Sequence, residues 1–560
     1  MEDNSNIYLM INYLLEVRTS LESLRRTYPN LIFTRITAGI YTVQVPLGAE
    51  NEFNLLQENI RYIDVPTLLG LSDSQALEAS GISVFHDYPY GALRGNGVLI
   101  GFVDTGIDYN NVFFKNADGT SRIVSIWDQT IPGNPPEEFG YGSTYSQEQL
   151  NEALRQSDPY SVVPTRDTNG HGTMLAGLAA GNDQSDMASY TGAAPDADII
   201  MVKLRPASQS LRDVYMVNEG AMAYQSNDIL TGIQYLINMA SILNQPIAIC
   251  IALGDNFGTH NGTSTIEQYL EMIGLSNGVV TVVAVGNEAN SGHHYKGELE
   301  PNIPINIELD VSENERGFLM ALWANIASRI YVSFRSPLGQ TIAKVPIINR
   351  RSQMYRFNLE PTVIDVNYLY TDPFTGEEGI AMRFITPTPG IWTITAESDT
   401  TLDGTFHIWL QREGFMNAET RFLEPNPNYT IQIPSTGEYI ISVGAYDALD
   451  NSVYVSSGRG PTRDDVVKPD FIAPGVNVEA PRVGGGLMAY TGTSVAAAIT
   501  AGAAALLLQW AILNGNLVEL NTRIARGILI RGARRMNNVV YPNNIEGYGR
   551  LDLIGSISNN

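Results

Sequence analysis

Four apolar runs, each ending in polar residues, most strongly constrain the fold of this 560-residue chain. They are GVLIGFVDTG at 97–106, DADIIMVKL at 196–204, QPIAICIALG at 245–254 and GVVTVVAVGN at 278–287. Short runs that are apolar throughout are typical of parallel strands buried on both faces of an α/β sheet. Helix-like segments such as LTGIQYLINMASILN lie between them. The sequence therefore predicts a parallel sheet covered by helices.

Three short motifs, far apart in the chain, contain the residue types of a serine nucleophile site. GFVDTGIDY holds Asp104, NGHGTMLAG holds His171 and YTGTSVAAA holds Ser494. A serine hydroxyl is a poor nucleophile near neutral pH, because it needs an imidazole to accept its proton and a carboxylate to orient that imidazole. The order Asp, His, Ser is that of subtilisin and differs from the order in chymotrypsin and the α/β-hydrolases.

The surroundings of each residue favour this interpretation over a structural role. Asp104 ends an apolar strand, where a carboxylate can be buried and still orient an imidazole. The competing carboxylate, Asp108, is predicted to have a loop or capping role. The glycines on both sides of His171 have no side chains, which indicates a site where other groups approach the backbone closely. Ser494 precedes an Ala-rich helix whose N-terminus favours negative charge, whereas an isolated serine there would be interpreted as a helix N-cap.

The composition limits the classes of partner. The formal net charge is −25 and the pI about 4.6, so we expect no binding to nucleic acid or to anionic membranes. The same acidity also serves solubility. The single cysteine, Cys250, lies in an apolar run and is predicted to be a buried structural thiol, with no intramolecular disulfide.

Two segments decide whether the sequence predicts a membrane span or an export signal. The run VAAAITAGAAALLLQWAIL at 495–513 is long enough to span a bilayer, but its small residues and its position after Ser494 favour a helix buried in a protein core. The N-terminal segment is acidic and polar and lacks a basic region before an apolar stretch, so no signal peptide is predicted.

The pattern of apolar residues divides the chain into three predicted domains. The first 70 residues alternate strand-like and helix-like segments in the order β-α-β-β-α-β of a ferredoxin-like fold. A stretch after residue 295 contains many short alternating segments separated by turn signals, which is typical of an inserted β-sandwich. The predicted domains are residues 1–70, an α/β domain of 75–295 with 431–560, and an inserted sandwich of 296–430.

Further segments resemble those of the subtilisin-like serine proteases, peptidase family S8. They are TGAAPDADIIMVKL at 191–204, SSGRGPT at 456–462 and KPDFIAPGV at 468–476. Val495 stands where a Met commonly follows the nucleophile, and the SRGP-type loop has one extra residue. Neither difference removes a group that the reaction uses. The resemblance implies the subtilisin-like fold and a serine endopeptidase with Asp104, His171 and Ser494 as catalytic residues.

The same resemblance implies roles for three other residues. Asn287, which follows an apolar strand, matches the family's oxyanion-hole asparagine, whose amide stabilises the developing negative charge. Leu253 and Gly254 match the extended edge that pairs with a substrate peptide. No cofactor is expected. The remaining histidines lack zinc-type spacing, no metal ligand is assigned, and structural calcium stays open without assigned ligands.

The lengths of chain between the motifs indicate which group of subtilisin-like proteases this sequence resembles. His171 follows Asp104 by 67 residues and Ser494 follows Asn287 by 207, against about 30 and roughly 65 in a minimal subtilisin. The excess between Asn287 and Ser494 is the predicted sandwich, which the resemblance identifies as a jelly roll. A short N-terminal prodomain, a subtilase core and a jelly-roll insert together resemble the clostridial Csp germination proteases.

This resemblance implies an endopeptidase that cleaves off its own prodomain, near residues 66–75, and activates the zymogen of a spore cortex-lytic enzyme during germination. The expected partners are that protein substrate and the chain's own prodomain. The expected location is synthesis in the cytoplasm followed by incorporation into the spore. Two alternatives stay open: a subtilisin-like protease with another role, and a non-catalytic signalling partner, against which the intact catalytic residues argue.

Overall fold

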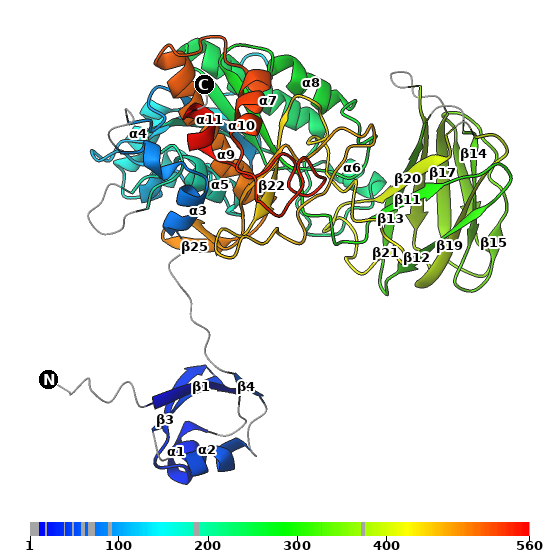
Figure 1. Ribbon diagram of the computed structural model, residues 1–560, viewed down its shortest axis with the longest axis horizontal. Coiled ribbons are helices and arrows are strands. Elements are labelled where there is room, and N and C mark those ends of the chain that lie inside the picture. Colours follow the sequence, from blue (N-terminus) through cyan, green and yellow to red (C-terminus); the bar gives the residue numbers. More distant parts are fainter. Residues whose placement is uncertain are drawn as a thin grey trace. The chain divides into compact units, whose positions relative to one another are not determined.

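The computed structural model describes residues 10–16, 20–37, 40–46, 50–57, 62–64, 73–87, 92–183, 190–325, 328–370, 376–401 and 403–558. The chain divides into two compact units, Met1–Leu71 and Ser72–Asn560 (Figure 1). Most of the predicted processing segment, residues 66–75, lies outside the described residues, which resume at helix α3 (Asp73–Ala79).

The first unit is a four-stranded antiparallel sheet with two helices. Its elements are β1 (Met10–Glu16), α1 (Leu21–Thr27), β2 (Ile32–Thr37), β3 (Ile40–Pro46), α2 (Glu50–Gln57) and β4 (Tyr62–Asp64). The strand order β2-β3-β1-β4, with every pair antiparallel, is that of a ferredoxin-like fold. Ser20 caps α1 by accepting a hydrogen bond from the backbone N–H of Ser23.

The second unit contains an eight-stranded sheet in the order β23-β22-β10-β9-β5-β8-β6-β7. Its strands are parallel except β7, which pairs antiparallel with β6. The four predicted apolar runs form β5, β8, β9 and β10, and the described bounds are β5 Leu99–Asp104, β6 Ile123–Asp128, β7 Ser143–Ser146, β8 Asp198–Lys203, β9 Ile247–Ile251, β10 Val279–Ala284, β22 Ile441–Tyr446 and β23 Phe471–Pro474.

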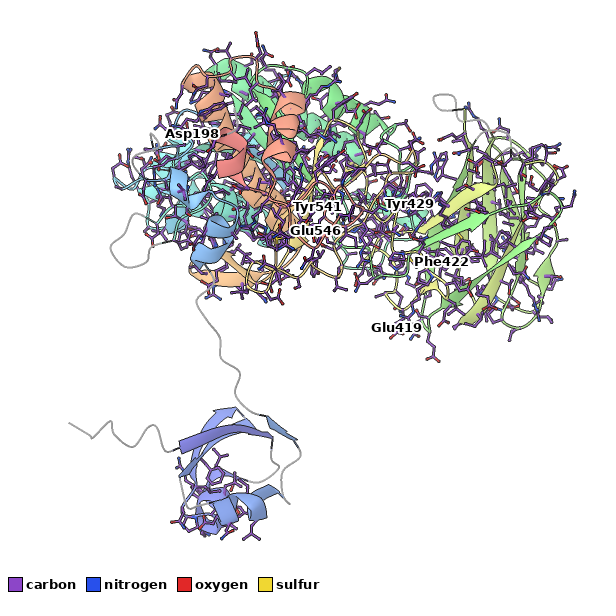
Figure 2. The ribbon with its side chains drawn as sticks, viewed as in Figure 1. Asp198, Glu419, Phe422, Tyr429, Tyr541 and Glu546 are labelled. Atoms are coloured by element: carbon purple, nitrogen blue, oxygen red, sulfur yellow. The ribbon has the colours of Figure 1, made fainter. Side chains whose placement is uncertain are left out.

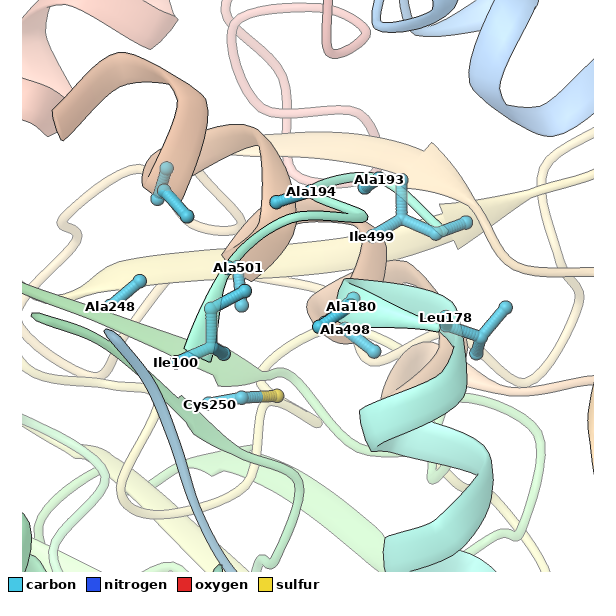
Figure 3. Close-up of a cluster of buried hydrophobic side chains, with 14 of the residues drawn as sticks. Ile100, Leu178, Ala180, Ala193, Ala194, Ala248, Cys250, Ala498, Ile499 and Ala501 are labelled. Atoms are coloured by element: carbon cyan, nitrogen blue, oxygen red, sulfur yellow. The ribbon is translucent and has the colours of Figure 1, made fainter. Parts of the chain in front are cut away.

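Helices cover both faces of this sheet. On one face α5 (His171–Ala180) and α9 (Thr493–Leu508) bury their side chains in a shared hydrophobic cluster, and on the other face α7 (Ser226–Leu243) and α8 (Thr265–Ile273) do the same. Figure 3 shows part of the first cluster, with Cys250 and Ile100 of the sheet, Leu178 of α5 and Ala498 of α9 among the labelled side chains. The remaining helices are α4 Gln147–Leu154, α6 Gln209–Val214, α10 Thr522–Gly532 and α11 Leu553–Ser558.

Helix α9 continues into a π-helical turn, Gln509–Leu513, and corresponds to the long apolar run of the sequence. Its most apolar window is 89% buried inside the protein. Alanine and glycine make up most of its first turns, so the helix packs closely against the neighbouring strands. This confirms the predicted core helix.

An antiparallel sandwich interrupts the α/β unit between β10 and β22. Its two sheets have the orders β11-β20-β13-β18-β17-β16 and β15-β14-β19-β12-β21 (Figure 1). Their inward side chains, including Phe384 and Trp392, form a separate hydrophobic cluster. The strands are β11 His294–Glu298, β12 Ile305–Val311, β13 Gly317–Ala324, β14 Ile330–Arg335, β15 Thr341–Ile342, β16 Ser352–Arg356, β17 Val363–Tyr370, β18 Glu378–Ile385, β19 Gly390–Ser398, β20 Thr405–Leu410 and β21 Arg421–Phe422. A hairpin of β24 (Val478–Pro481) and β25 (Leu487–Tyr490) precedes α9.

Buried aromatic and imidazole rings join the sandwich to the α/β fold. The ring of Trp409 on β20 stacks on His260, with ring centroids 4.0 Å apart, and also on His294 and His407. Tyr429, labelled in Figure 2, accepts a hydrogen bond from Trp409 Nε1 through its carbonyl oxygen. We call His260, His294, His407 and Trp409 the ring cluster.

Burial dominates the titration of the ring cluster. It lowers the pKa of His260 to about 4, of His294 to about 3 and of His407 to about 2. Both ring nitrogens of His260 lie beside carbonyl oxygens, of Ile431 at 2.8 Å and Asn256 at 2.9 Å, which favours the protonated ring. Burial outweighs this effect, so the cluster is neutral at pH 7.

Candidate active site

Asp104 ends strand β5 and is fully buried at the carboxyl edge of the parallel sheet. In open α/β sheets this edge is where functional side chains gather. The backbone N–H of Thr105 donates a hydrogen bond to Asp104 Oδ1 at 2.8 Å. The carboxylate is thus fixed by its own turn and points toward the start of helix α5.

His171 is the first residue of α5, and its Nδ1 lies 2.9 and 3.0 Å from the two carboxylate oxygens of Asp104. Asp167 holds the preceding loop by accepting hydrogen bonds from the backbone N–H groups of Asn169, Gly170 and Thr173. A Cβ atom at residue 172 would lie 2.1 Å from the carbonyl oxygen of Gly106, so only glycine fits after the histidine.

The charge environment favours the protonated imidazole. Burial lowers the pKa of His171, but the charge of Asp104 and its hydrogen bond, together with the charge of Asp167, outweigh burial and raise the pKa above its ordinary value. With Nδ1 bound to Asp104, Nε2 is the nitrogen that faces the cleft. Asp104 therefore orients the ring and stabilises the imidazolium that forms when it accepts a proton.

Ser494 lies in the first turn of α9, which begins at Thr493. Gly492 precedes this helix with a φ of 153°, a backbone conformation that favours glycine. Ser494 Oγ makes no hydrogen bond with any described residue. The free hydroxyl and His171 line the same cleft, and contacts between nucleophile and base commonly tighten only when substrate binds.

Asn287 follows β10, and its side chain is held by the helix that carries the nucleophile. Its Oδ1 accepts hydrogen bonds from the backbone N–H and the hydroxyl of Thr493 at 3.1 and 3.2 Å. The amide oxygen is therefore occupied, and Nδ2 is the group left to donate to an oxyanion in the cleft. The N-terminus of α9 adds a partial positive charge at the same place.

Leu253 and Gly254 follow β9 after one intervening residue, Ala252, and line the cleft. Within the described residues, neither the N–H nor the C=O of Leu253 has a hydrogen-bond partner. Asp255, the residue after Gly254, is already paired with Ile433 through two backbone hydrogen bonds of 2.9 Å. This arrangement leaves a short free edge to which an extended peptide can add by β-augmentation.

The cleft that contains these residues has a volume of about 810 Å³. Most of its remaining lining is apolar and comes from the α6 region, from α7 and from the loops after β9, with Arg412 and Phe415 contributed by the segment that follows the sandwich strand β20. The inserted sandwich therefore supplies part of the substrate cleft.

Gln432 fills the space beside the oxyanion position. A Cβ atom added at Gly254 or at Gly286 would lie 2.6 or 2.2 Å from Gln432 Oε1, so this amide lies between the two glycines. Gln432 Nε2 donates a hydrogen bond to Asn256 Oδ1 at 3.1 Å, which holds the side chain in place. The Gln432 side chain therefore occupies the space between Gly254 and Gly286.

The structure brings together Asp104, His171, Asn287 and Ser494 with the edge at 253–254, as the resemblance implied. Asp108 lies apart from the imidazole; it accepts hydrogen bonds from the Tyr160 hydroxyl and the backbone N–H of Gly484. In the part of the chain that the structure describes, no three His, Cys, Asp or Glu side chains are grouped to hold a metal ion.

Sequence reasoning missed four residues of the site. Thr493 and Asp167 lie within or beside the recognised motifs, and their hydroxyl and carboxylate were the available signals. Arg412 and Gln432 had no such signal, because each lies more than 100 residues from the nearest catalytic motif before it in the chain. Only the return of the chain from the sandwich to the sheet places Arg412 in the cleft lining and Gln432 beside Gly254.

Such an arrangement can carry out acyl transfer. Ser494 Oγ attacks the carbonyl carbon of a peptide bond, His171 Nε2 accepts the hydroxyl proton and later returns it to the leaving amine, and Asn287 Nδ2 donates to the oxyanion. An acyl-enzyme forms and is then hydrolysed by water. Each step uses only side chains that the structure places in the cleft.

Comparisons with known proteins agree with this geometry. The model of the subtilase family matches residues 95–308 and 417–549, and the gap between the two segments is most of the sandwich. The structure is similar to that of the CspB protease of Clostridium perfringens, with a TM-score of 0.76 and 32% identity over 86% of this chain and 98% of that one.

Relatives found by sequence match smaller parts of the two chains compared. Serine protease AprX of Bacillus subtilis is 39% identical over 100 residues, 14% of this chain and 23% of AprX. Subtilisin-like protease SBT3.1 of Arabidopsis thaliana is 24% identical over 448 residues, 74% of this chain and 53% of that protein. The chain thus spans about a quarter of AprX and half of SBT3.1. Since the family model matches more than half of the chain, this protein belongs to the subtilase family, the subtilisin-like serine endopeptidases.

Proposed function

We propose that this protein is a processing endopeptidase that removes its own N-terminal unit and then activates the zymogen of a spore cortex-lytic enzyme by limited proteolysis during germination. The observation that carries the proposal is the similarity to CspB protease along nearly the whole of both chains, sandwich included. The chain would be made in the cytoplasm and incorporated into the spore.

The shape of the cleft supports restricted cleavage. Gln432 occupies the space between Gly254 and Gly286, and two residues of the inserted segment, Arg412 and Phe415, line the cleft. A site shaped in this way selects among peptide segments more strongly than an open groove does, because each added contact discriminates between substrates. Selective cleavage suits the activation of one zymogen better than bulk digestion.

Self-cleavage is tested by expressing the full chain as wild type and as Ser494→Ala and measuring intact masses. We expect the wild type to lose an N-terminal fragment ending between residues 66 and 75, and the Ser494→Ala chain to keep it. A wild-type chain that stays intact after folding would contradict self-cleavage. Addition of wild-type protein to the Ser494→Ala chain separates cleavage within one molecule from cleavage between molecules.

The substrate is tested with a purified cortex-lytic zymogen and with casein in parallel. A processing enzyme is expected to cut the folded zymogen at one bond and to leave casein largely intact. Efficient casein digestion with no zymogen cleavage would favour a subtilisin-like protease of another role. No cleavage of either protein, at a concentration where Ser494 reacts with a fluorophosphonate, would contradict the zymogen assignment alone.

A further inference from the structure

A single arginine from the inserted segment lies at the edge on which a substrate peptide would pair. Arg412 follows β20 and lines the cleft together with His171, Asn287 and Ser494. Its Nη1 donates a hydrogen bond to the carbonyl oxygen of Gly254 at 3.1 Å. The guanidinium is therefore held at the edge formed by Leu253 and Gly254.

Most of the donors on this guanidinium are unused. Besides Gly254, the one acceptor of Arg412 among the described residues is the carbonyl oxygen of Glu413, 3.3 Å from Nε, and the guanidinium lies over the ring of Phe415. An arginine has five N–H donors. No carboxylate of a described residue lies within 4.0 Å of Arg412, and the charge of Arg412 acts on Asp255 and Glu288 only from a longer distance.

The backbone on both sides of Arg412 is anchored. Gln411 Nε2 donates to the carbonyl oxygen of Tyr215 at 2.6 Å, and Gln411 Oε1 accepts from the N–H of Leu319 at 3.1 Å. The N–H of Glu413 donates to Glu288 Oε1 at 2.9 Å. The arginine is thus presented from a fixed segment, as a recognition residue must be.

The charge of the cleft is opposite in sign to that of the whole chain. The net charge of the protein is −25, yet the cleft lining has two arginines, Arg212 and Arg412, and one carboxylate, Asp255. The Arg212 guanidinium is used within its own loop, where it donates to the carbonyl oxygens of Ala221 and Asn218. Burial raises the pKa of Asp255, which favours its neutral form. Of the two arginines that line the cleft, Arg412 is therefore the one with donors left for a ligand.

We propose that Arg412 is a specificity-determining residue that binds the carboxylate of a substrate Asp or Glu at one of the positions P2 to P4. A planar guanidinium with free paired donors binds a carboxylate in two parallel hydrogen bonds, and enclosure in the cleft strengthens them. The preferred cleavage sites thus carry an acidic residue shortly before the scissile bond. This inference rests on the endopeptidase activity of the family and is independent of which zymogen is the target.

The test compares peptides that differ only by Glu or Gln at P2, P3 or P4, with the full-length chain as wild type, Arg412→Gln, Arg412→Lys and Arg316→Gln. Arg316 is exposed, pairs with Glu219 outside the cleft and serves as the matched control. For one position we expect wild type to have about tenfold higher kcat/KM for Glu than for Gln, as one charged hydrogen-bond pair provides. Arg412→Gln should abolish that ratio, Arg412→Lys should retain part of it, and Arg316→Gln should leave it unchanged.

Binding of the same peptides to the Ser494→Ala chain, with and without Arg412→Gln, provides a second measurement when turnover is slow. An equal effect of Arg412→Gln on Glu and Gln peptides would overturn the proposal. A rise in kcat/KM for all peptides would also overturn it, since Arg412 would then only block the Gly254 carbonyl. Absence of any Glu preference in cleavage and binding, while the wild type still cleaves a protein substrate, rejects the proposal and leaves the endopeptidase activity standing.

Discussion

Thr493 fixes the orientation of Asn287: its backbone N–H and its hydroxyl both donate to Asn287 Oδ1, at 3.1 and 3.2 Å. Because Thr493 begins the helix that carries Ser494, the oxyanion donor and the nucleophile are positioned by one element. The Thr493 hydroxyl is also 3.2 Å from the N–H of Gly286, the residue before Asn287. Nδ2 is thereby directed into the cleft without any contact from substrate.

We therefore predict that Thr493→Val lowers kcat with little change in KM. One of two hydrogen bonds to Asn287 is lost, which corresponds to about 1 kcal/mol or roughly fivefold in rate. Asn287→Ala should lower kcat by a factor of about 10²–10³. Adding Thr493→Val to Asn287→Ala should lower kcat little further, because the side chain that Thr493 orients is already absent. Thr500→Val, which removes a buried hydroxyl on the same helix bonded to Ala496, is the control for stability alone.

Replacement of Asp104 should change both the rate and its pH dependence. In the wild type kcat/KM rises with pH as His171 loses its proton, with a midpoint above the ordinary histidine value because Asp104 raises that pKa. Asp104→Asn should move the midpoint to lower pH and reduce kcat by about 10⁴. NMR titration of His171 measures the shift directly. An unchanged midpoint in Asp104→Asn, or an equal rate loss in Asp108→Asn, would contradict the assigned role.

Gln432 is predicted to limit the size of the P1 side chain. The amide lies between Gly254, at the edge where a substrate peptide would pair, and Gly286, the residue before Asn287. Gln432→Ala empties that space, so the ratio of kcat/KM for large apolar P1 residues to that for small ones should rise by tenfold or more, about the value of one or two buried methylene groups. Peptides that vary only at P1 measure the ratio. A ratio equal to that of the wild type would place the P1 side chain elsewhere.

The ring cluster predicts loss of stability in mild acid. The pKa values of His260, His294 and His407 lie at about 4, 3 and 2 in the folded protein, against about 6.5 when unfolded. Between the folded and unfolded pKa values, the unfolded chain binds more protons than the folded chain. The free energy of unfolding therefore keeps its full value above pH 6.5 and decreases as the pH falls, by about 2 kcal/mol per histidine at pH 5.

Urea unfolding at pH 8 and pH 5 measures this loss, with the change in midpoint as the readout. His407→Asn removes one titrating ring while keeping a donor toward His294 Nε2, which lies 3.0 Å from His407 Nδ1 in the wild type. The variant should show a smaller difference between the two pH values. A difference as large as that of the wild type would show that the acid sensitivity arises outside the cluster.

Much of the α/β fold could be predicted from the local pattern of apolar residues. The runs that form β5, β9 and β10 are buried on both faces, and uniform apolarity is the expected consequence. Helix α7 begins at Ser226, four residues before the apolar segment LTGIQYLINMASILN that predicted it, because its first turn is polar and does not belong to the apolar stripe. Local pattern thus specifies which segments are strands more reliably than where a helix begins.

The cleft walls could not be predicted in the same way. The contact of Arg412 with Gly254 joins residues 158 positions apart, and the contact of Gln432 with Gly254 depends on how the chain returns from the sandwich. Neither residue has a periodicity or a motif that signals a ligand. Their roles arise from tertiary packing of an inserted domain, so the catalytic chemistry was predictable and the substrate selectivity was not.

The sandwich also has a consequence for the order of folding. Strand β10, which leads to Asn287, pairs in parallel with β22, and the chain between them is the sandwich. Closing so long a disordered loop has an entropic cost that increases with the logarithm of its length. A sandwich with its own hydrophobic cluster can fold first and bring its two ends together, which leaves only a short gap to close. The insert would then act as an internal scaffold for assembly of the protease, with maturation rate set by a domain that takes no part in the chemistry.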